Sequence, residues 1–217
     1  MPVRSTLAPL QYDLLVAFAP HAPEFFLTGG AALAHFHLGH RQTDDLDFFV
    51  HADVLPQGAE ALRQAAVEIG ASVSVITDAP DFKRYLVSRA AEAIVVDLVR
   101  DRQPSLAAKA IIDGIAVDRP EEILANKLTP SVITRGEPRD IVDIWYLERL
   151  GLRVEEVLPG SMRKEVFTAA ELSQHLSRWH IGDDTPVPGG LTVEQVRAYV
   201  RELSERLAIV AFPRQGT

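Results

Sequence analysis

Residues 25–50 read FFLTGGAALAHFHLGHRQTDDLDFFV and are the most informative part of the chain. The apolar run at 25–27 predicts a short strand, which the pair Gly29-Gly30 ends. Good helix formers follow over residues 31–38, and the glycine directly after them predicts the end of that helix. Residues 45–50 predict a second strand with side chains alternating between two faces. The stretch therefore predicts a strand, a tight turn, a helix and a strand in succession.

Two carboxylates stand out on the second of these strands. Asp45 and Asp47 are two residues apart, so both point to one face about 7 Å apart along the backbone. Adjacent carboxylates repel unless a cation lies between them, and Mg²⁺ combines one or two protein carboxylates with substrate phosphates. At Gly29-Gly30 the backbone can approach a phosphate closely. The pattern favours a nucleotide–metal site, and the alternative is a polar turn leading into an edge strand.

A third carboxylate interrupts an otherwise apolar strand. Asp97 lies within residues 93–99, which read AIVVDLV. Burying an unpaired carboxylate is costly, so Asp97 needs a metal, a cation or a water-filled cleft. The alternative is a buried salt bridge, with Arg100 or Arg102 as the partner. Three carboxylates so placed suit a two-metal site for phosphoryl or nucleotidyl transfer.

The rest of the chain divides into a strand-rich first part and a helical second part. Outside residues 25–50, strands are predicted at residues 71–76, 85–87, 93–99 and 114–117, and a helix at 57–69. Proline and two glutamates at 120–122 indicate a helix start. The predicted helices of the second part are 121–128, 139–150, 169–179 and 193–207, separated by residues 136–138, by Pro159-Gly160 and by a polar linker at 182–190. The fold class is therefore α+β, with a small mixed β-sheet core and flanking helices over residues 1–118. A helical region over 119–217 follows, and we expect it to complete the active-site cleft.

Composition narrows the classes of function. The 217 residues include no cysteine, which excludes disulfides, thiolate nucleophiles and zinc ribbons. No stretch approaches the ~20 apolar residues of a membrane span, so we expect a soluble cytoplasmic protein with no membrane partner. The net charge of −8 argues against a surface that binds nucleic acid everywhere, although 13 of the 22 basic residues lie in residues 119–217. His35, His37 and His40 lack the spacing of a zinc site, and packing or exposure is expected for each.

These motifs resemble those of a known enzyme family. The run from Leu27 to Phe49 is similar to the first motif of the AbiEii/AbiGii-type nucleotidyltransferase toxins, in the DNA-polymerase-β-like nucleotidyltransferase superfamily. The shared pattern is Gly-Gly, a helix, then Arg, a hydroxyl residue and Asp-Leu-Asp. Thr43 stands where Ser is commoner and keeps the hydroxyl. Lys127 and residues 135–143 resemble the later pattern of Lys, Arg and Arg-Asp-x-x-Asp, so that the matching stretches together span residues 25–150.

The resemblance implies roles for individual residues of the first part. Asp45 and Asp47 would bind Mg²⁺ or Mn²⁺ together with the triphosphate of an NTP. Asp97 would complete the metal site or take the acceptor proton. The phosphate contacts would come from Gly29, Gly30 and Thr43.

The second part would supply further catalytic and nucleotide-binding groups. Lys127 would hold the triphosphate and stabilise charge in the transition state, although an exposed lysine in the last turn of a helix is the alternative. Asp140 would act in catalysis, and Arg139 and Asp143 in nucleotide binding. Helix-dipole stabilisation by Asp140 and an i,i+4 pair between Arg139 and Asp143 are the alternatives. Asp140, Asp143 and Leu147 are predicted to share one helix face.

The resemblance implies a metal-dependent nucleotidyltransferase that moves an NMP from an NTP to an acceptor hydroxyl. The acceptor would be an RNA end, particularly of tRNA, and the enzyme would act as a toxin with a separately encoded antitoxin. One alternative is a nucleotidyltransferase that modifies small molecules such as aminoglycoside antibiotics. The other is a catalytically inactive nucleotide-binding module.

Overall fold

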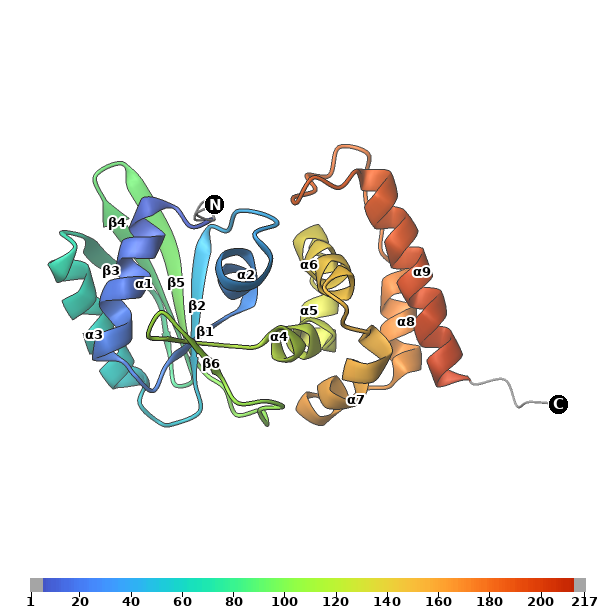
Figure 1. Ribbon diagram of the computed structural model, residues 1–217, viewed down its shortest axis with the longest axis horizontal. Helices are drawn as coiled ribbons and strands as arrows, with labels where there is room; N and C mark the ends of the chain where they lie inside the picture. Colours follow the sequence, from blue (N-terminus) through green and yellow to red (C-terminus); the bar gives the residue numbers. More distant parts are fainter. Residues whose placement is uncertain (1–5, 213–217) are drawn as a thin grey trace. The chain divides into compact units, whose positions relative to one another are not determined.

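The computed structural model describes residues 6–212, and the chain forms two compact units (Figure 1). The first unit contains the described residues up to Arg102 together with Ala108–Arg119. The second contains Gln103–Ala107 and the described residues from Pro120 onward. The chain therefore passes into the second unit for five residues and returns before its final crossing.

A mixed sheet forms the centre of the first unit. Among the described residues it has seven strands in the order β3-β4-β5-β2-β1-β7-β6. Their bounds are β1 Phe26–Thr28, β2 Asp45–Val50, β3 Ser72–Ala79, β4 Phe82–Arg89, β5 Glu92–Arg100, β6 Ala110–Ile112 and β7 Ile115–Val117. β2 is parallel to β5 and β1 is parallel to β7, whereas the other neighbours are antiparallel. The predicted α+β class with a mixed sheet is confirmed.

Two helices, α1 (Pro9–His21) and α3 (Leu55–Glu68), lie side by side on one face of the sheet (Figure 1). Phe18 of α1 packs on Phe48 of β2 with ring centroids 4.4 Å apart. Leu46 and Leu98 on the same sheet face are fully buried. These apolar contacts form the core of the first unit, because alternating strand side chains send every second residue under the helices.

The sequence did not predict α1, and one polar residue explains why. Gln11 interrupts the apolar pattern, yet only 1% of it is exposed. Its amide nitrogen donates to the carbonyl of Thr43 at 2.9 Å, and its amide oxygen accepts from the amide of Ala8 at 2.8 Å. A polar side chain can be buried in a core when its hydrogen bonds are satisfied. The apolar periodicity of the sequence does not show which partners satisfy Gln11, so it does not predict α1.

The helix predicted at 31–38 is present in two segments. α2 (Gly29–Ala32) continues as the π-helix η1 (Leu33–Leu38). Gly39 ends it as predicted, with a φ of 64° that glycine adopts readily, and its amide donates to the carbonyl of Ala34 at 3.1 Å. The wider π turn is a departure that amphipathic spacing does not predict.

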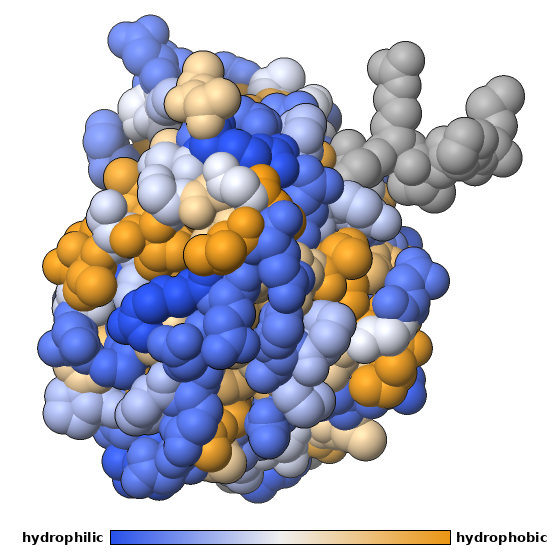
Figure 2. Space-filling view, turned by 90° about the vertical axis from the view of Figure 1, so that its left-hand side faces the viewer, coloured by the Kyte–Doolittle hydropathy of each residue, from blue (hydrophilic) through white to orange (hydrophobic). Residues whose placement is uncertain are grey.

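The edge strand β3 exposes apolar side chains. Figure 2 views the side of the first unit that α3 and β3 form, where hydrophobic patches alternate with hydrophilic surface. Val75 and Ile76 of β3 are 57% and 53% exposed. The register between β3 and β4 shifts beside Val75, and such irregularity limits pairing of an edge with further strands.

The second unit is helical, as the sequence predicts. Its helices are α4 Pro120–Lys127, α5 Pro130–Ile133, α6 Pro138–Arg149, α7 Val154–Lys164, α8 Ala169–Ser177 and α9 Val193–Ala211. Thr168 and Thr192 cap α8 and α9, each accepting from the amide three residues later at 3.2 Å. α8 and α9 lie side by side (Figure 1), and the hydroxyls of Ser173 and Ser204 each donate to the other's carbonyl. No helix among the described residues is long and apolar enough to cross a membrane.

The prediction that Pro159-Gly160 separates two segments is wrong, because both residues lie inside α7. A Cβ at Gly160 would lie 2.5 Å from Cδ1 of Leu106, so the helix approaches residues 103–107 more closely than another residue would allow. Glu122 also holds this segment, since its carboxylate accepts from the amide of Leu106 at 2.7 Å. Tertiary packing therefore outweighs the helix-breaking tendency of Pro-Gly.

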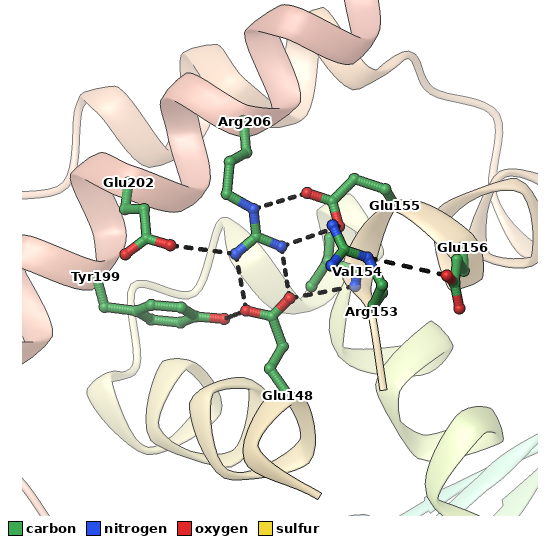
Figure 3. Close-up of polar contacts among 8 residues, drawn as sticks. All are labelled: Glu148, Arg153, Val154, Glu155, Glu156, Tyr199, Glu202 and Arg206. Atoms are coloured by element: carbon green, nitrogen blue, oxygen red, sulfur yellow. Dashed lines mark hydrogen bonds and ion pairs between the residues drawn. The ribbon is translucent and has the colours of Figure 1, made fainter. Parts of the chain in front are cut away.

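An arginine on α9 connects three helices of the second unit (Figure 3). Arg206 donates two hydrogen bonds to Glu148 of α6 and two to Glu155 of α7. Tyr199 donates to the Glu148 carboxylate at 2.6 Å. Burial raises the pKa of Glu148, but the bonds from Arg206 and Tyr199 outweigh it and lower that pKa below its ordinary value. The residues of this cluster, which we call the Arg206 network, are Glu148, Glu155, Tyr199 and Arg206.

Candidate active site

The structure brings the three predicted carboxylates together on one face of the sheet. Asp45 and Asp47 lie on β2, and Asp97 lies directly opposite Asp47 on the parallel neighbour β5. Residues paired across two strands point to the same face, so all three side chains share the face opposite to α1 and α3. Leu46 and Leu98 alternate with them toward the core. The register of β2 and β5 therefore brings together Asp47 and Asp97, which are fifty residues apart in the sequence.

The glycine turn lies against this cluster. Gly29 directly follows β1 and has a φ of 65°. A Cβ at this position would lie 2.6 Å from Oδ2 of Asp47. A Cβ on Gly30 would lie 2.5 Å from Nη2 of Arg41. The turn backbone therefore lies close to both a carboxylate and a guanidinium, and a side chain at either glycine would displace one of these groups.

Arg41 is a site residue that the sequence analysis left without a role. It stands in the family pattern, but only the fold places its guanidinium against the turn. An arginine and free helix N–H groups at one turn can bind phosphate oxygens.

Thr43 orients Asp45 in this structure. Only 7% of Thr43 is exposed, and its hydroxyl donates to Oδ1 of Asp45 at 2.7 Å. Gln11 holds the same turn through the Thr43 carbonyl at 2.9 Å. The observed role of Thr43 is therefore to position a carboxylate, and its predicted contact with phosphate stays a prediction.

Asp97 is paired with an arginine from a neighbouring strand. It is 6% exposed, and Arg84 of β4, directly opposite in register, donates to both of its oxygens at 2.8 and 2.7 Å. The predicted partners Arg100 and Arg102 are wrong, because they bind Asp53 and Asp81. Arg100 is three residues after Asp97 on β5, so its side chain points to the other face of the sheet. The partner of Asp97 therefore comes from the neighbouring strand β4.

Arg84 is a second site residue that the sequence analysis missed. The bonds to Asp97 raise the pKa of its guanidinium, and the charges of Asp97, Asp47 and Asp45 add to that effect. Arg84 therefore supplies positive charge to the whole carboxylate cluster. No local sequence pattern identifies Arg84 as a site residue, because only the pairing of β4 with β5 brings it next to Asp97.

The donor chemistry of the cluster suits a hard divalent cation. Among residues 6–212 there is no group of three or more His, Cys, Asp or Glu side chains already arranged to hold a metal. Asp45 and Asp47 nevertheless present carboxylate oxygens on one face, which fits Mg²⁺ or Mn²⁺. Both oxygens of Asp97 are occupied by Arg84. The residues therefore fit a cation at Asp45 and Asp47, with the third carboxylate held by an internal cation.

The second unit contains a separate charged cluster around Lys127. The ammonium lies 2.8 Å from Oδ1 of Asp140 and 2.7 Å from Oδ2 of Asp143. Arg135 donates to the other oxygen of Asp140 at 3.0 Å. Lys127 is only 6% exposed, so the alternative of an exposed lysine is wrong. Burial works against the charge of Lys127, but Asp143 and Asp140 outweigh it and raise the pKa of the ammonium.

The helix-face prediction for α6 is confirmed. Asp140 and Asp143 both contact the ammonium of Lys127, as residues on one face should. Ile144 and Leu147 are buried, but so are Ile141 and Val142, so burial alone does not mark this face. Arg139 lies on the more exposed side, with its Nε 4.0 Å from Glu137 and 46% of its side chain exposed. The face that carries the two acids therefore packs within the second unit.

Two histidines of the first unit, His35 and His37, lie among aromatic and backbone groups. His35 contacts the rings of Tyr12 and Phe36, and burial lowers its pKa. A ring nitrogen of His37 lies 2.8 Å from the carbonyl of Asp118. Packing and a backbone hydrogen bond therefore account for these two residues.

Comparison with known families agrees with this geometry. The model of a family described as nucleotidyl transferase AbiEii toxin, type IV toxin–antitoxin system, matches residues 13–186. The chain belongs to the AbiEii family. It is therefore a nucleotidyltransferase of a toxin family, and the resemblance seen in the motifs is confirmed. The AbiEii match also extends beyond residues 25–150, into helices that carry no recognised motif.

Solved structures share the fold. A proposed nucleotidyltransferase from H. pylori is 16% identical, with a TM-score of 0.60 over 96% of this chain and 97% of that one. JHP933 from Helicobacter pylori is 18% identical, with a TM-score of 0.57 over 93% of each chain. MenT4, a nucleotidyltransferase toxin from Mycobacterium tuberculosis H37Rv, is 14% identical, with a TM-score of 0.59 over 92% of this chain and 82% of MenT4. No curated protein sequence matches the chain.

Proposed function

We propose that this AbiEii-family enzyme moves an NMP from an NTP to an acceptor hydroxyl with the help of Mg²⁺ or Mn²⁺. The observation that carries the proposal is the placement of Asp45, Asp47 and Asp97 on one sheet face, with Gly29 in contact range of Asp47. Asp45 and Asp47 hold the cation. When bound, it neutralises phosphate charge and stabilises the attacking and leaving oxygens of an in-line displacement.

The turn and its neighbours bind the triphosphate in this proposal. Backbone N–H groups at Gly29 and Gly30 donate to phosphate oxygens, and Arg41 adds a planar cation beside them. Thr43 keeps Asp45 oriented toward the same face through its 2.7 Å hydrogen bond. Asp97 completes the metal site or accepts the proton of the attacking hydroxyl.

Lys127 acts in the same reaction in this proposal, as the family pattern implies. Lys127 holds the triphosphate and stabilises charge that develops on it. Asp140 and Asp143 keep the ammonium charged and fix its position, as their distances of 2.8 and 2.7 Å indicate. Arg139, whose side chain is 46% exposed, makes a further phosphate contact in this proposal. The completion of the active-site cleft by residues 119–217 stays a prediction.

The acceptor that we propose is an RNA end, particularly of tRNA. The description of the family as a toxin of a type IV toxin–antitoxin system supports a target in the cell's own machinery and a separately encoded antitoxin. The fold shared with MenT4, a nucleotidyltransferase toxin, is consistent with this assignment.

The test incubates purified protein with Mg²⁺, each radiolabelled NTP and total tRNA, and follows label on RNA. We expect labelled RNA with the unmodified protein and none with the Asp45→Asn, Asp47→Asn double variant. Asp44→Asn is the matched control, because Asp44 adjoins the pair but lies exposed before the strand. Label on aminoglycosides instead of RNA would replace the acceptor by a small molecule. Binding of NTP without transfer to any acceptor would favour an inactive nucleotide-binding module.

A further inference from the structure

The pairing of Arg84 with Asp97 uses both oxygens of a carboxylate in the proposed metal site. Nε of Arg84 donates to Oδ1 at 2.8 Å and Nη2 donates to Oδ2 at 2.7 Å. Each Asp97 oxygen keeps a second lone pair, but a cation bound there would lie close to the guanidinium, and the two positive groups would repel each other. Arg84 and a divalent cation therefore compete for Asp97.

The burial of the two partners is unequal. The side chain of Asp97 is 8% exposed, whereas that of Arg84 is 44% exposed. Asp97 is thus fixed in the sheet and needs a positive partner at all times. The Arg84 guanidinium lies near solvent, with its central carbon 5.3 Å from the ring of Phe82. Arg84 is therefore the partner that can move into solvent once another cation neutralises Asp97.

A second ion pair in the same unit provides a reference. Arg102 binds Asp81 through two hydrogen bonds of 3.0 and 2.8 Å, which is the same arrangement. Both members of this pair are well exposed, with 62% of the Arg102 side chain and 42% of the Asp81 side chain exposed. Water can replace Arg102 at Asp81, but it replaces Arg84 at the buried Asp97 poorly. The two arginines thus have the same charge and hydrogen-bond geometry, but Arg84 neutralises a buried carboxylate and Arg102 an exposed one.

We propose that Arg84 is an internal counter-cation of the carboxylate cluster, which holds Asp97 when no metal is bound and gives way when a divalent cation takes that carboxylate. The inference rests on the proposed function, because it takes Asp45, Asp47 and Asp97 as the metal-binding residues. Arg84 is on this account a positioning residue that sets the metal concentration at which the enzyme becomes competent. It also keeps three neighbouring carboxylates from repelling one another in the metal-free protein.

The experiment measures binding of Mn²⁺ alone, by electron paramagnetic resonance at fixed ionic strength, without nucleotide. We expect Arg84→Met to bind Mn²⁺ about fivefold more tightly than the unmodified protein, as loss of a competing, partly exposed ion pair should give. Arg84→Lys keeps the charge but loses the two-pronged fork, so its affinity should lie between the two. Arg102→Met removes the same charge from a matched pair and should leave the affinity unchanged. Circular dichroism checks that each variant is folded, and Arg84→Gln replaces Arg84→Met if that variant is not.

Two further variants separate this inference from the proposed function. Asp97→Asn should weaken Mn²⁺ binding, and Asp45→Asn, Asp47→Asn should abolish it. If Arg84→Met binds Mn²⁺ no more tightly than Arg102→Met while the double variant loses binding, the metal site stands and the role of Arg84 is refuted. If Asp97→Asn leaves the affinity unchanged, Arg84 and Asp97 form a structural pair only. If neither the unmodified protein nor Arg84→Met binds Mn²⁺, both the metal site and the counter-cation are wrong.

Discussion

Replacing Arg206 by methionine tests what holds the second unit together. Arg206 makes two hydrogen bonds to each of two carboxylates, Glu148 and Glu155, whose side chains are 16% and 24% exposed (Figure 3). A hydrogen bond to a charged group contributes about 1.5–3 kcal/mol, and breaking a fully buried pair costs about 3–5 kcal/mol. Because water still reaches both carboxylates, we expect the free energy of unfolding to fall by about 2–4 kcal/mol.

Urea denaturation followed by tryptophan fluorescence measures this change. The chain has two tryptophans, Trp145 and Trp179, and both belong to the second unit, so the signal reports on that unit. Arg153→Met is the matched control, because Arg153 is 65% exposed and lies 3.8 Å from Glu155 and Glu156. The control should change stability by less than about 0.5 kcal/mol. A loss below about 1 kcal/mol for Arg206→Met would refute the assignment of the Arg206 network as a structural clamp.

The same network predicts a pH dependence. The pKa values of Glu148 and Glu155 are lowered in the folded protein, from an ordinary value of 4.5. A lowered folded-state pKa adds stability above the unfolded-state value, and this stability is lost as the pH falls through the folded-state pKa. The difference in stability between the unmodified protein and Arg206→Met should therefore be full at neutral pH and shrink below pH 4.5. An equal difference at every pH would contradict this reasoning.

Two further substitutions test the candidate active site. Lys127→Met leaves two buried carboxylates without their ammonium and should lower the free energy of unfolding of the second unit by about 3–5 kcal/mol, measured by the same fluorescence; a neutral result would refute the interpretation of this cluster as an ion-pair network that stabilises the second unit. Gly29→Ala places a Cβ 2.6 Å from Oδ2 of Asp47 and should weaken Mn²⁺ binding more than Gly39→Ala does. Gly39 has a similar φ of 64° with no atom within 4 Å of such a Cβ, so equal Mn²⁺ affinities would show that backbone strain alone matters.

Local patterns predicted the elements that carry the proposed metal site. β2 begins at Asp45 and ends at Val50, as the alternation of polar and apolar residues indicates. The helix after the glycine pair ends at Leu38, because Gly39 adopts the left-handed conformation that terminates helices. The bounds of such strands and helices depend on residues within a few positions of each other, so they can be predicted from the local sequence.

Other elements depended on distant partners. α1 contains the buried Gln11, which is stable there because the Thr43 carbonyl accepts its amide proton. α7 passes through Pro159-Gly160, because Leu106 occupies the space that a side chain on Gly160 would fill. In both cases the tertiary contact outweighs the local propensity on which prediction relies.

Strand alternation was enough to place Asp45 and Asp47 on one face of a strand that follows a glycine turn, and the motifs indicated the nucleotidyltransferase family. The cation that pairs with Asp97 and the burial of Lys127 could be seen only in the folded chain. Strand register brings Arg84 to Asp97, and helix packing encloses Lys127 between Asp140 and Asp143. The reason is that ion-pair partners are chosen by spatial proximity, which folding sets between residues far apart in the chain.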